Sequence, residues 1–254
     1  MEYTRENLVK LFTCIDHTTL NATDTESTVE VFCRDILDMS ERVGETPAAV
    51  CVYPPYVKIA AQTLRGSGIA VASVACGFPS AQMPVSLKLD EVRYVLENGA
   101  TEVDMVISRG YIVDGELTKA YDEIAAVREL CIKQKLKVIL ETGELKTEAN
   151  ISAAAQTAIA AGADFIKTST GKIPTGATIE AAEIMLKILT NCNGFSRKPV
   201  GFKASGGIST VEQAMEYADL VGLLRGSQYI NKQYFRIGAS RLTEKLVQLL
   251  AEKN

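Results

Sequence analysis

Two lysines lie in short apolar segments of this sequence, where lysines are rare. Lys167 interrupts the apolar run that begins at Ala163 and ends in a loop at Gly171. Lys203 repeats the pattern in the segment 199–207, about one strand–helix unit later. Such runs are typical of buried parallel strands. Because lysine is almost never fully buried unless something uses it, the pattern favours a functional site over two lysines that reach solvent from surface strands.

A pair of buried lysines could carry out amine chemistry. A lysine in water has a pKa near 10.4, so only about one amine in a few thousand is neutral at pH 7. A nucleophilic amine needs a pKa lower by about three units, or about 4 kcal/mol. A second ammonium at about 5 Å contributes about 3 kcal/mol at an effective dielectric near 20, and burial supplies the rest. One lysine would then condense with an aldehyde or ketone, and the iminium would act as an electron sink for making or breaking a carbon–carbon bond.

Asp104 is the candidate proton carrier for this chemistry. Side chains alternate along a strand, so Asp104 faces away from its apolar neighbours in the predicted strand 102–107. We expect it to meet Lys167 and Lys203 inside the fold, together with Asp16 from the first strand, and to shuttle protons. The alternative is a carboxylate that only neutralises a buried lysine, which does not exclude catalysis.

Strand and helix patterns alternate along the whole chain. The predicted strands are 13–16, 48–52, 70–74, 102–107, 137–141, 164–169, 199–207 and 220–224. The predicted helices are 6–12, 25–40 with Thr23 or Asp24 as N-cap, 56–65, 85–98, 116–134, 147–161, 177–189, 210–217 and 240–251. This order predicts an α/β protein with one domain over residues 1–254, a single (β/α)₈ TIM barrel with a short extra N-terminal helix. An open doubly wound sheet is less favoured, because no GxGxxG motif follows the first strand.

Three glycine-bearing segments indicate a phosphate site. They are Thr170–Lys172 after the sixth strand, Gly206–Gly207 after the seventh, and Gly238–Ser240 at the start of the last predicted helix. Backbone N–H groups in glycine turns and at helix N-termini bind anions, and barrels place such sites after their last two strands. Ordinary turns explain any one glycine pair, so the case depends on all three lying together.

Composition narrows the class of protein further. The 254 residues carry 27 Lys and Arg against 31 Asp and Glu, with mixed signs throughout, so neither a nucleic-acid nor a membrane partner is expected. The start lacks a signal-peptide layout, and the longest uncharged stretch, 66–87, is broken by Gly, Ser and Pro. The six cysteines form no CxxC pair, which indicates reduced thiols in a cytoplasmic protein. With His17 as the one histidine, a zinc site with two or three His ligands is impossible.

Six segments together resemble the 2-deoxyribose-5-phosphate aldolase family of class I, Schiff-base aldolases. In chain order they are Asp16–Leu20, Cys51–Pro54, Glu102–Val106, Phe165–Gly171, Gly201–Gly207 and Ile237–Ser240. The resemblance covers nearly the whole chain, and the two lysine segments are its most specific parts. It implies reversible cleavage of 2-deoxy-D-ribose 5-phosphate to acetaldehyde and D-glyceraldehyde 3-phosphate, without a cofactor or metal. The partners would be the sugar phosphate and the aldehyde, and an assembly of identical chains is left open.

The resemblance also implies roles for particular residues. Lys167 would form the Schiff base, Lys203 would lower its pKa and Asp104 would act as acid and base. The expected contacts to the substrate are Asp16, Thr18, Cys51, Thr170 and Lys172. The expected contacts to the phosphate are Gly171, Gly206, Gly207, Gly238 and Ser240.

Some positions depart from the pattern of the family, and others can be explained by a structural role alone. Arg241 stands where a small hydroxyl residue is expected, Gly176 stands where Asn is common, and no tyrosine ends the sequence, although some members use one in proton transfer. His17 is either a satisfied structural histidine or a substrate contact, and Cys51 is either a buried inert thiol or part of the pocket. Glu141 is given no role, and the charges of 121–137 are explained by a solvated helix face. A Schiff-base lyase for a longer ketose phosphate and a non-catalytic sugar-phosphate sensor are the other candidate functions.

Overall fold

The computed structural model describes residues 1–191 and 198–252. In these residues eight parallel strands form a closed barrel in chain order, from β1 to β8 and back to β1. The strands are β1 Ile15–Thr18, β2 Ala49–Val52, β3 Ala70–Ala75, β4 Glu102–Val106, β5 Lys135–Ile139, β6 Phe165–Lys167, β7 Gly201–Ser205 and β8 Phe235–Ala239. The predicted TIM barrel is therefore confirmed.

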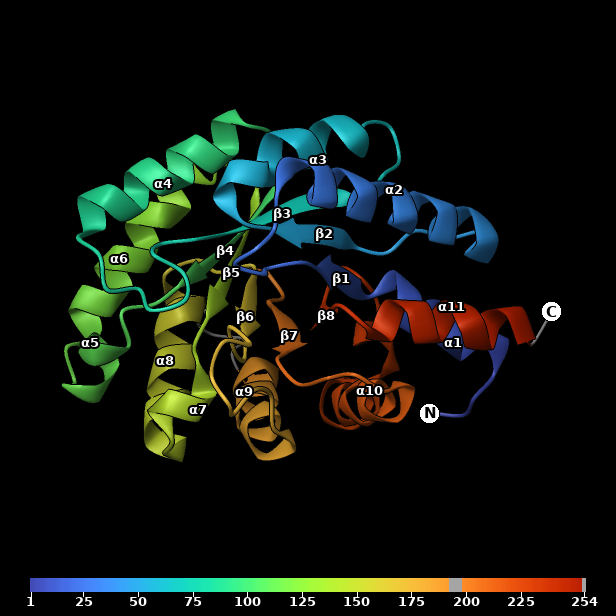
Figure 1. The fold of residues 1–254 in the computed structure, drawn as a ribbon. Coiled ribbons are helices and arrows are strands. Elements are labelled where there is room, and N and C mark those ends of the chain that lie inside the picture. The colour runs from blue at the N-terminus through green and yellow to red at the C-terminus, as the bar shows by residue number, and fades with distance from the viewer. Residues whose placement is uncertain (192–197, 253–254) are drawn as a thin grey trace.

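Helices surround the barrel, as Figure 1 shows. They are α1 Arg5–Thr13, α2 Glu26–Val43, α3 Val57–Thr63, α4 Val85–Glu97, α5 Arg109–Val113, α6 Leu117–Leu130, α7 Thr142–Leu145, α8 Glu148–Ala160, α9 Ile179–Asn191, α10 Val211–Arg225 and α11 Leu242–Glu252. Two 3₁₀ turns, η1 Pro54–Tyr56 and η2 Ser227–Tyr229, complete the described elements. The extra helix α1 precedes β1, as predicted, and it lies beside α11 (Figure 1). None of the helices in the described ranges is long and apolar enough to cross a membrane.

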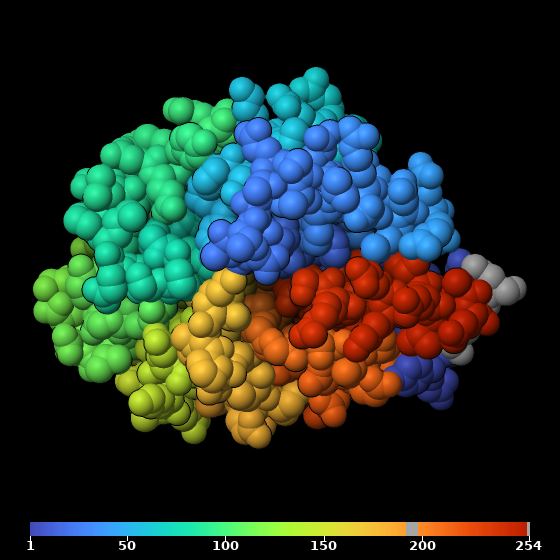
Figure 2. Space-filling model, viewed as in Figure 1, coloured from blue at the N-terminus to red at the C-terminus, as the bar shows by residue number. Residues whose placement is uncertain are grey.

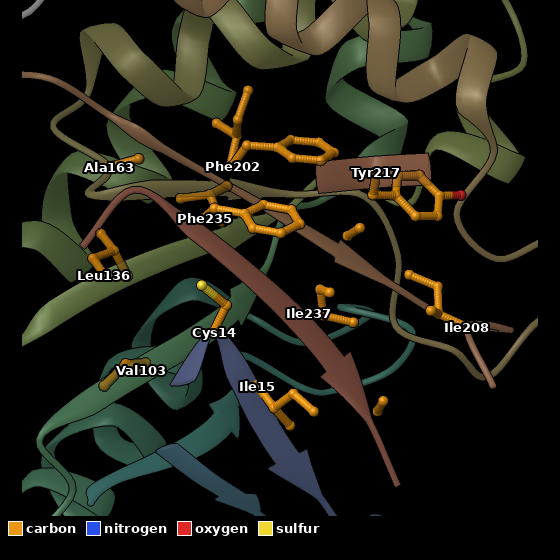
Figure 3. Close-up of a cluster of buried hydrophobic side chains, with 14 of the residues drawn as sticks. Cys14, Ile15, Val103, Leu136, Ala163, Phe202, Ile208, Tyr217, Phe235 and Ile237 are labelled. Atoms are coloured by element: carbon orange, nitrogen blue, oxygen red, sulfur yellow. The ribbon is translucent and has the colours of Figure 1, made fainter. Parts of the chain in front are cut away.

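Strand alternation separates an apolar layer from a charged interior. Outward-facing side chains such as Phe202, Phe235 and Ile237 pack under the helices in one large apolar cluster (Figure 3). The rings of Phe202 and Phe235 stack at 6.5 Å between centroids. Side chains alternate along a strand, so the residues that follow Phe202 and Phe235, which are Lys203 and Arg236, point into the barrel. The apolar layer thus fixes which side chains enter the interior.

The predicted eighth strand at 220–224 is wrong. This segment is the last part of α10, in which Val221 is buried whereas Leu223 is 80% exposed. The true β8 lies later, at Phe235–Ala239, and it includes Gly238, which we had placed at the start of the last helix. A five-residue apolar run fits a helix and a strand equally well. Arg236 and Gly238 interrupt β8, so its sequence lacks the expected apolar pattern.

Smaller differences concern the ends of elements. Helix α2 has Thr25 as its N-cap, in a capping box with Thr28, instead of the predicted Thr23 or Asp24. Strand β5 begins two residues earlier than predicted and ends before Glu141, which has a left-handed backbone (φ 58°). The region 116–134 ends as a helix at Leu130, and its charged residues are not all solvated, because Glu123 is buried.

Candidate active site

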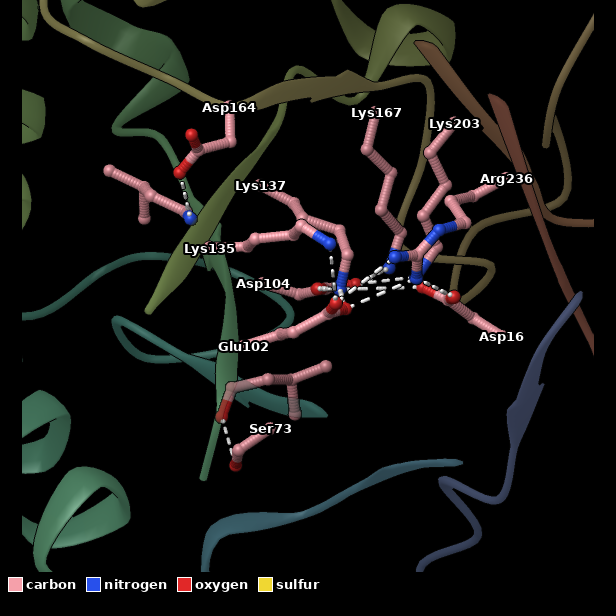
Figure 4. A network of polar contacts seen from close by, with 12 residues as sticks. Asp16, Ser73, Glu102, Asp104, Lys135, Lys137, Asp164, Lys167, Lys203 and Arg236 are labelled. Atoms are coloured by element: carbon pink, nitrogen blue, oxygen red, sulfur yellow. Dashed lines mark hydrogen bonds and ion pairs between the residues drawn. The ribbon is translucent and has the colours of Figure 1, made fainter. Parts of the chain in front are cut away.

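The lysines and Asp104 meet inside the barrel as predicted. Lys167 and Lys203 are direct neighbours in the register of β6 and β7. Their Nζ atoms lie 2.9 and 2.7 Å from the same oxygen of Asp104, Oδ2 (Figure 4). Asp16 joins them from β1, where its carboxylate accepts a hydrogen bond from Lys203. Four side chains that are far apart in sequence therefore form one contact group.

Three further charged residues complete this group, and the sequence analysis did not identify them. Lys137 on β5 lies 2.7 Å from Asp104 Oδ1 and 2.6 Å from Glu102 Oε2. Arg236 on β8 donates to Asp16 Oδ1 at 2.6 Å and to Glu102 Oε1 at 3.0 Å. We call these seven residues the buried charge cluster: Asp16, Glu102, Asp104, Lys137, Lys167, Lys203 and Arg236.

The charged neighbours keep most of the cluster ionised. Burial alone would raise the pKa of Asp104, but Lys137, Lys167 and Lys203 hold it well below its usual range. Burial would likewise lower the pKa of Lys203, but the carboxylates of Asp104 and Asp16 raise it. The same carboxylates, with Glu102, raise the pKa of Lys137.

Lys167 is the exception, because its pKa is lowered. Burial is the main cause that lowers its pKa; Asp104 opposes this shift, and the ammonium of Lys203 lowers the pKa further. Burial therefore contributes more to this lowered pKa than the second ammonium does, in contrast to the expectation from the sequence. Lys167 is thus the cluster's best candidate for a neutral amine.

A polar cavity of about 370 Å³ lies at the carboxyl ends of the strands. Of the buried charge cluster, Lys167 alone lines it. Most of the predicted contact residues line it too: Thr18, Thr170, Gly171, Lys172, Gly206, Gly207, Gly238 and Ser240. Further residues line the cavity that were not among the expected contacts: Thr19, Asn21, Phe32, Ser205, Ile208 and Ser209.

The loops at the cavity rim contact one another closely. Lys172 donates to the carbonyl of Leu20, so the gold segment after β6 meets the blue N-terminal segment in Figure 2. Ala177 donates to the carbonyl of Gly206 at 3.0 Å. A Cβ atom on Gly176 would lie 2.3 Å from that carbonyl oxygen, so this glycine permits the close approach. Gly176 therefore allows the loops after β6 and β7 to lie in close contact.

Two predicted substrate contacts do not reach the cavity. Asp16 is fully buried, and its two oxygens are occupied by cations of the charge cluster. Cys51 is also fully buried inside the barrel, where burial raises the pKa of its thiol to about 11. The inert-thiol interpretation of Cys51 fits this position. Five cysteines of the described ranges are free and buried, whereas Cys192 lies outside these ranges.

His17 and Glu141 have structural partners. His17 points outward from β1, stacks on Phe32 at 4.0 Å between ring centroids, and shares a 2.8 Å hydrogen bond with Thr243. Burial lowers the pKa of His17 to about 3. This is the satisfied histidine of the two interpretations. Glu141, whose pKa burial raises, accepts hydrogen bonds from the backbone and hydroxyl of Thr170 and fixes that loop.

Glycine turns and one helix N-terminus lie together at the predicted phosphate site. Gly171, Gly206 and Gly207 have positive φ angles, which point backbone N–H groups in directions that other residues rarely allow. Ser240 and Arg241 line the same cavity just before α11. In residues 1–191 and 198–252 no group of three or more His, Cys, Asp or Glu side chains could hold a metal ion.

A closed parallel barrel with a lysine at the floor of a polar cavity is typical of enzymes that attack carbonyl substrates through an amine. The comparisons with known proteins specify the class. The model of the DeoC/LacD family of aldolases matches residues 10–232. The chain belongs to this family, and it is an aldolase, an enzyme of the lyase class.

Individual relatives agree with the family match. The deoxyribose-phosphate aldolases of Bos taurus and Homo sapiens are each 41% identical to the chain over 248 residues, with 92% of this chain and 78% of theirs covered. A tetrameric deoxyribose phosphate aldolase from Aeropyrum pernix has a similar solved structure, with a TM-score of 0.75 and 28% identity. That match covers 96% of this chain and 91% of the other.

Proposed function

We propose that this aldolase cleaves 2-deoxy-D-ribose 5-phosphate reversibly to D-glyceraldehyde 3-phosphate and acetaldehyde. The observation that carries the proposal is that Lys167 alone of the buried charge cluster reaches the cavity, while Asp104 contacts its amine from behind and Lys203 contacts the same Asp104 oxygen. The 41% identity to two deoxyribose-phosphate aldolases supports this substrate.

The proposed reaction starts with the neutral amine of Lys167. It attacks the C1 aldehyde of the open-chain sugar, and loss of water from the carbinolamine gives an iminium. Removal of the C3 hydroxyl proton breaks the C2–C3 bond, and its electron pair moves to the enamine as D-glyceraldehyde 3-phosphate leaves. Protonation of the enamine at C2 and hydrolysis of the iminium then release acetaldehyde and restore the amine.

The remaining roles follow from the contacts. Asp104, which touches both lysines, shuttles protons to the substrate through a water. It passes a proton from Lys203 to the departing carbinolamine hydroxyl, and it later takes the C3 hydroxyl proton and returns it to C2 of the enamine. Thr18, Thr170 and Lys172 bind the sugar hydroxyls from the cavity wall, and Asp16 acts from behind through Lys203. Gly171, Gly206, Gly207, Gly238 and Ser240 hold the phosphate, with Arg241 as an additional cation beside it.

The assembly and the compartment belong to the same proposal. We propose that copies of the chain associate, as the tetrameric relative from Aeropyrum pernix does. The free thiols of the five described cysteines support a reducing cytoplasmic compartment. Sedimentation at several concentrations tests the association.

Borohydride trapping tests the reaction. The protein is reduced in the presence of 2-deoxyribose 5-phosphate or acetaldehyde, and the labelled peptide is identified by mass analysis. An adduct on Lys167 is the expected result. An adduct on Lys203 would exchange the roles of the two lysines, and binding of the sugar phosphate without any adduct would favour the sensor function.

A further inference from the structure

Glu102 and Arg236 form an ion pair deeper in the barrel than the reacting groups. Glu102 precedes Asp104 by two residues on β4, so it lies one layer farther from the cavity at the carboxyl ends of the strands. Arg236 reaches it from β8 through contacts of 3.0 and 3.2 Å, and both side chains are at most 3% exposed. The reaction steps above make no use of this pair.

The charges of the buried cluster can be counted. Asp16, Glu102 and Asp104 supply three negative charges, and Lys137, Lys203 and Arg236 supply three positive charges. Lys167 is the fourth cation when it is protonated. The cluster is therefore neutral when Lys167 is a free amine and carries one positive charge when Lys167 is an ammonium. Uncompensated charge is costly in a buried site.

We propose that Glu102 and Arg236 are positioning residues. Their charges keep the buried charge cluster neutral when Lys167 is a free amine, and so favour that form of Lys167. The inference rests on the proposed Schiff-base function and adds two residues that never touch the substrate. Arg236 acts through Asp16 and Glu102, and Glu102 acts through Lys137, which contacts Asp104.

The groups around Lys167 come from several elements. They are Asp16 on β1, the neutral thiol of Cys51 on β2, Glu102 and Asp104 on β4, Lys137 on β5, Lys203 on β7, Arg236 on β8, and Glu141 and Lys172 on the loops at the rim. Figure 4 shows Lys167, Lys203 and Arg236 extending toward the carboxylates of Asp16 and Asp104. Removal of one buried charge should therefore change the pKa of the Lys167 amine, because few groups lie between them.

The test measures the rate of borohydride trapping with acetaldehyde against pH, because acetaldehyde does not use the phosphate site. A unit charge at about 10 Å shifts a pKa by about one unit at an effective dielectric near 20. Arg236→Met makes the cluster more negative and should raise the pH midpoint of trapping by about one unit. Glu102→Gln makes it more positive and should lower the midpoint by a similar amount. The double variant Arg236→Met/Glu102→Gln restores the balance and should return the midpoint close to that of the wild type.

Opposite shifts that cancel distinguish charge balance from packing. A merely structural role would reduce trapping in both single variants and reduce it further in the double variant, with unchanged midpoints. Glu102→Gln changes the side-chain volume little. The expected fall in its pH midpoint of trapping therefore tests the proposal even if circular dichroism shows that Arg236→Met does not fold. An unshifted midpoint in Glu102→Gln overturns the proposal.

Lys135→Met is the matched control. Lys135 lies 3.6 Å from Glu102 but is 42% exposed, so solvent screens its charge and no shift is expected. A shift in Lys135→Met as large as that in Arg236→Met contradicts a role of the buried pair. If the wild-type protein forms no adduct, the proposed function fails first and the inference falls with it; an adduct with unshifted variants overturns the inference alone.

Discussion

The pKa of Lys203 is raised and that of Lys167 is lowered, although both lysines are buried and adjacent. The difference lies in their partners, since in the described ranges Lys203 forms ion pairs with both Asp16 and Asp104, whereas Lys167 forms one with Asp104. Lys203→Leu removes one positive charge from the cluster, so Lys167 should keep its proton to higher pH. We expect the pH midpoint of trapping to rise by about one to two units. A pH profile of borohydride trapping measures this shift.

Lys187→Met is a suitable control for this variant. Lys187 lies on the surface of α9, paired with Glu183 and 59% exposed, and its loss should leave the profile unchanged. If the midpoint of Lys203→Leu equals that of the control and the protein is folded, Lys203 does not set the protonation of Lys167.

The same residues show how far sequence reasoning reaches. Lys167, Lys203 and Asp104 could be predicted because a charge inside an apolar strand is conspicuous and strand parity gives its direction. Glu102 and Lys137 stand at the starts of predicted strands, where an exposed charge is ordinary, so nothing marked them as buried. Arg236 was missed because its segment was not predicted as a strand.

Strand β8 was not predicted from the sequence. Gly238, which lies within it, shows why its sequence is unusual for a strand. A Cβ atom on Gly238 would lie 2.8 Å from Ser205 Cβ and 3.1 Å from Lys203 Cε. This glycine therefore leaves space for the lysine stem, and that packing requirement outweighs the strand pattern. Sequence periodicity cannot reveal such a contact, because it depends on a residue 35 positions earlier.

Gly238→Ala should displace Lys203 and reduce the rate of trapping with acetaldehyde by about tenfold or more, with a loss of about 1–3 kcal/mol in stability from overpacking. Acetaldehyde carries no phosphate, so this readout separates packing against Lys203 from phosphate binding. Gly110→Ala is the control, because a Cβ there has nothing within 4 Å. An unchanged rate with acetaldehyde and a weaker affinity for the sugar phosphate would assign Gly238 to the phosphate alone.

A second buried ion pair joins two helices outside the barrel. Lys88 on α4 donates to Glu123 on α6 and, at 2.7 Å, to Ser108, and the lysine is fully buried. Lys88→Met leaves Glu123 buried without its cation, which should lower the free energy of unfolding by about 3–5 kcal/mol. Chemical denaturation measures this change. The double variant Lys88→Met/Glu123→Met should be less destabilised than the single variant, and an equal or greater loss would show that packing rather than charge is responsible.

For the whole molecule, His17 contributes to how stability depends on pH below neutrality. The pKa of His17 is about 3 in the folded protein because burial disfavours the imidazolium, against about 6.5 in an unfolded chain. Below pH 6.5 the unfolded state therefore binds a proton that the folded state cannot bind. The contribution to stability is complete above that pH and is lost progressively toward pH 3. At pH 5 the loss is about 2 kcal/mol.

His17→Gln isolates this contribution, because the carboxylates titrate in both proteins and cancel in the comparison. Among them is Glu141, whose pKa is raised by burial, so that its own contribution has the opposite sign and grows as the pH falls. The free energy of unfolding from urea titrations at pH 7 and pH 5 should fall about 2 kcal/mol further in the wild type than in His17→Gln. Equal falls would mean that imidazolium is tolerated between Phe32 and Thr243, and the outward face of β1 would then have to admit water on protonation.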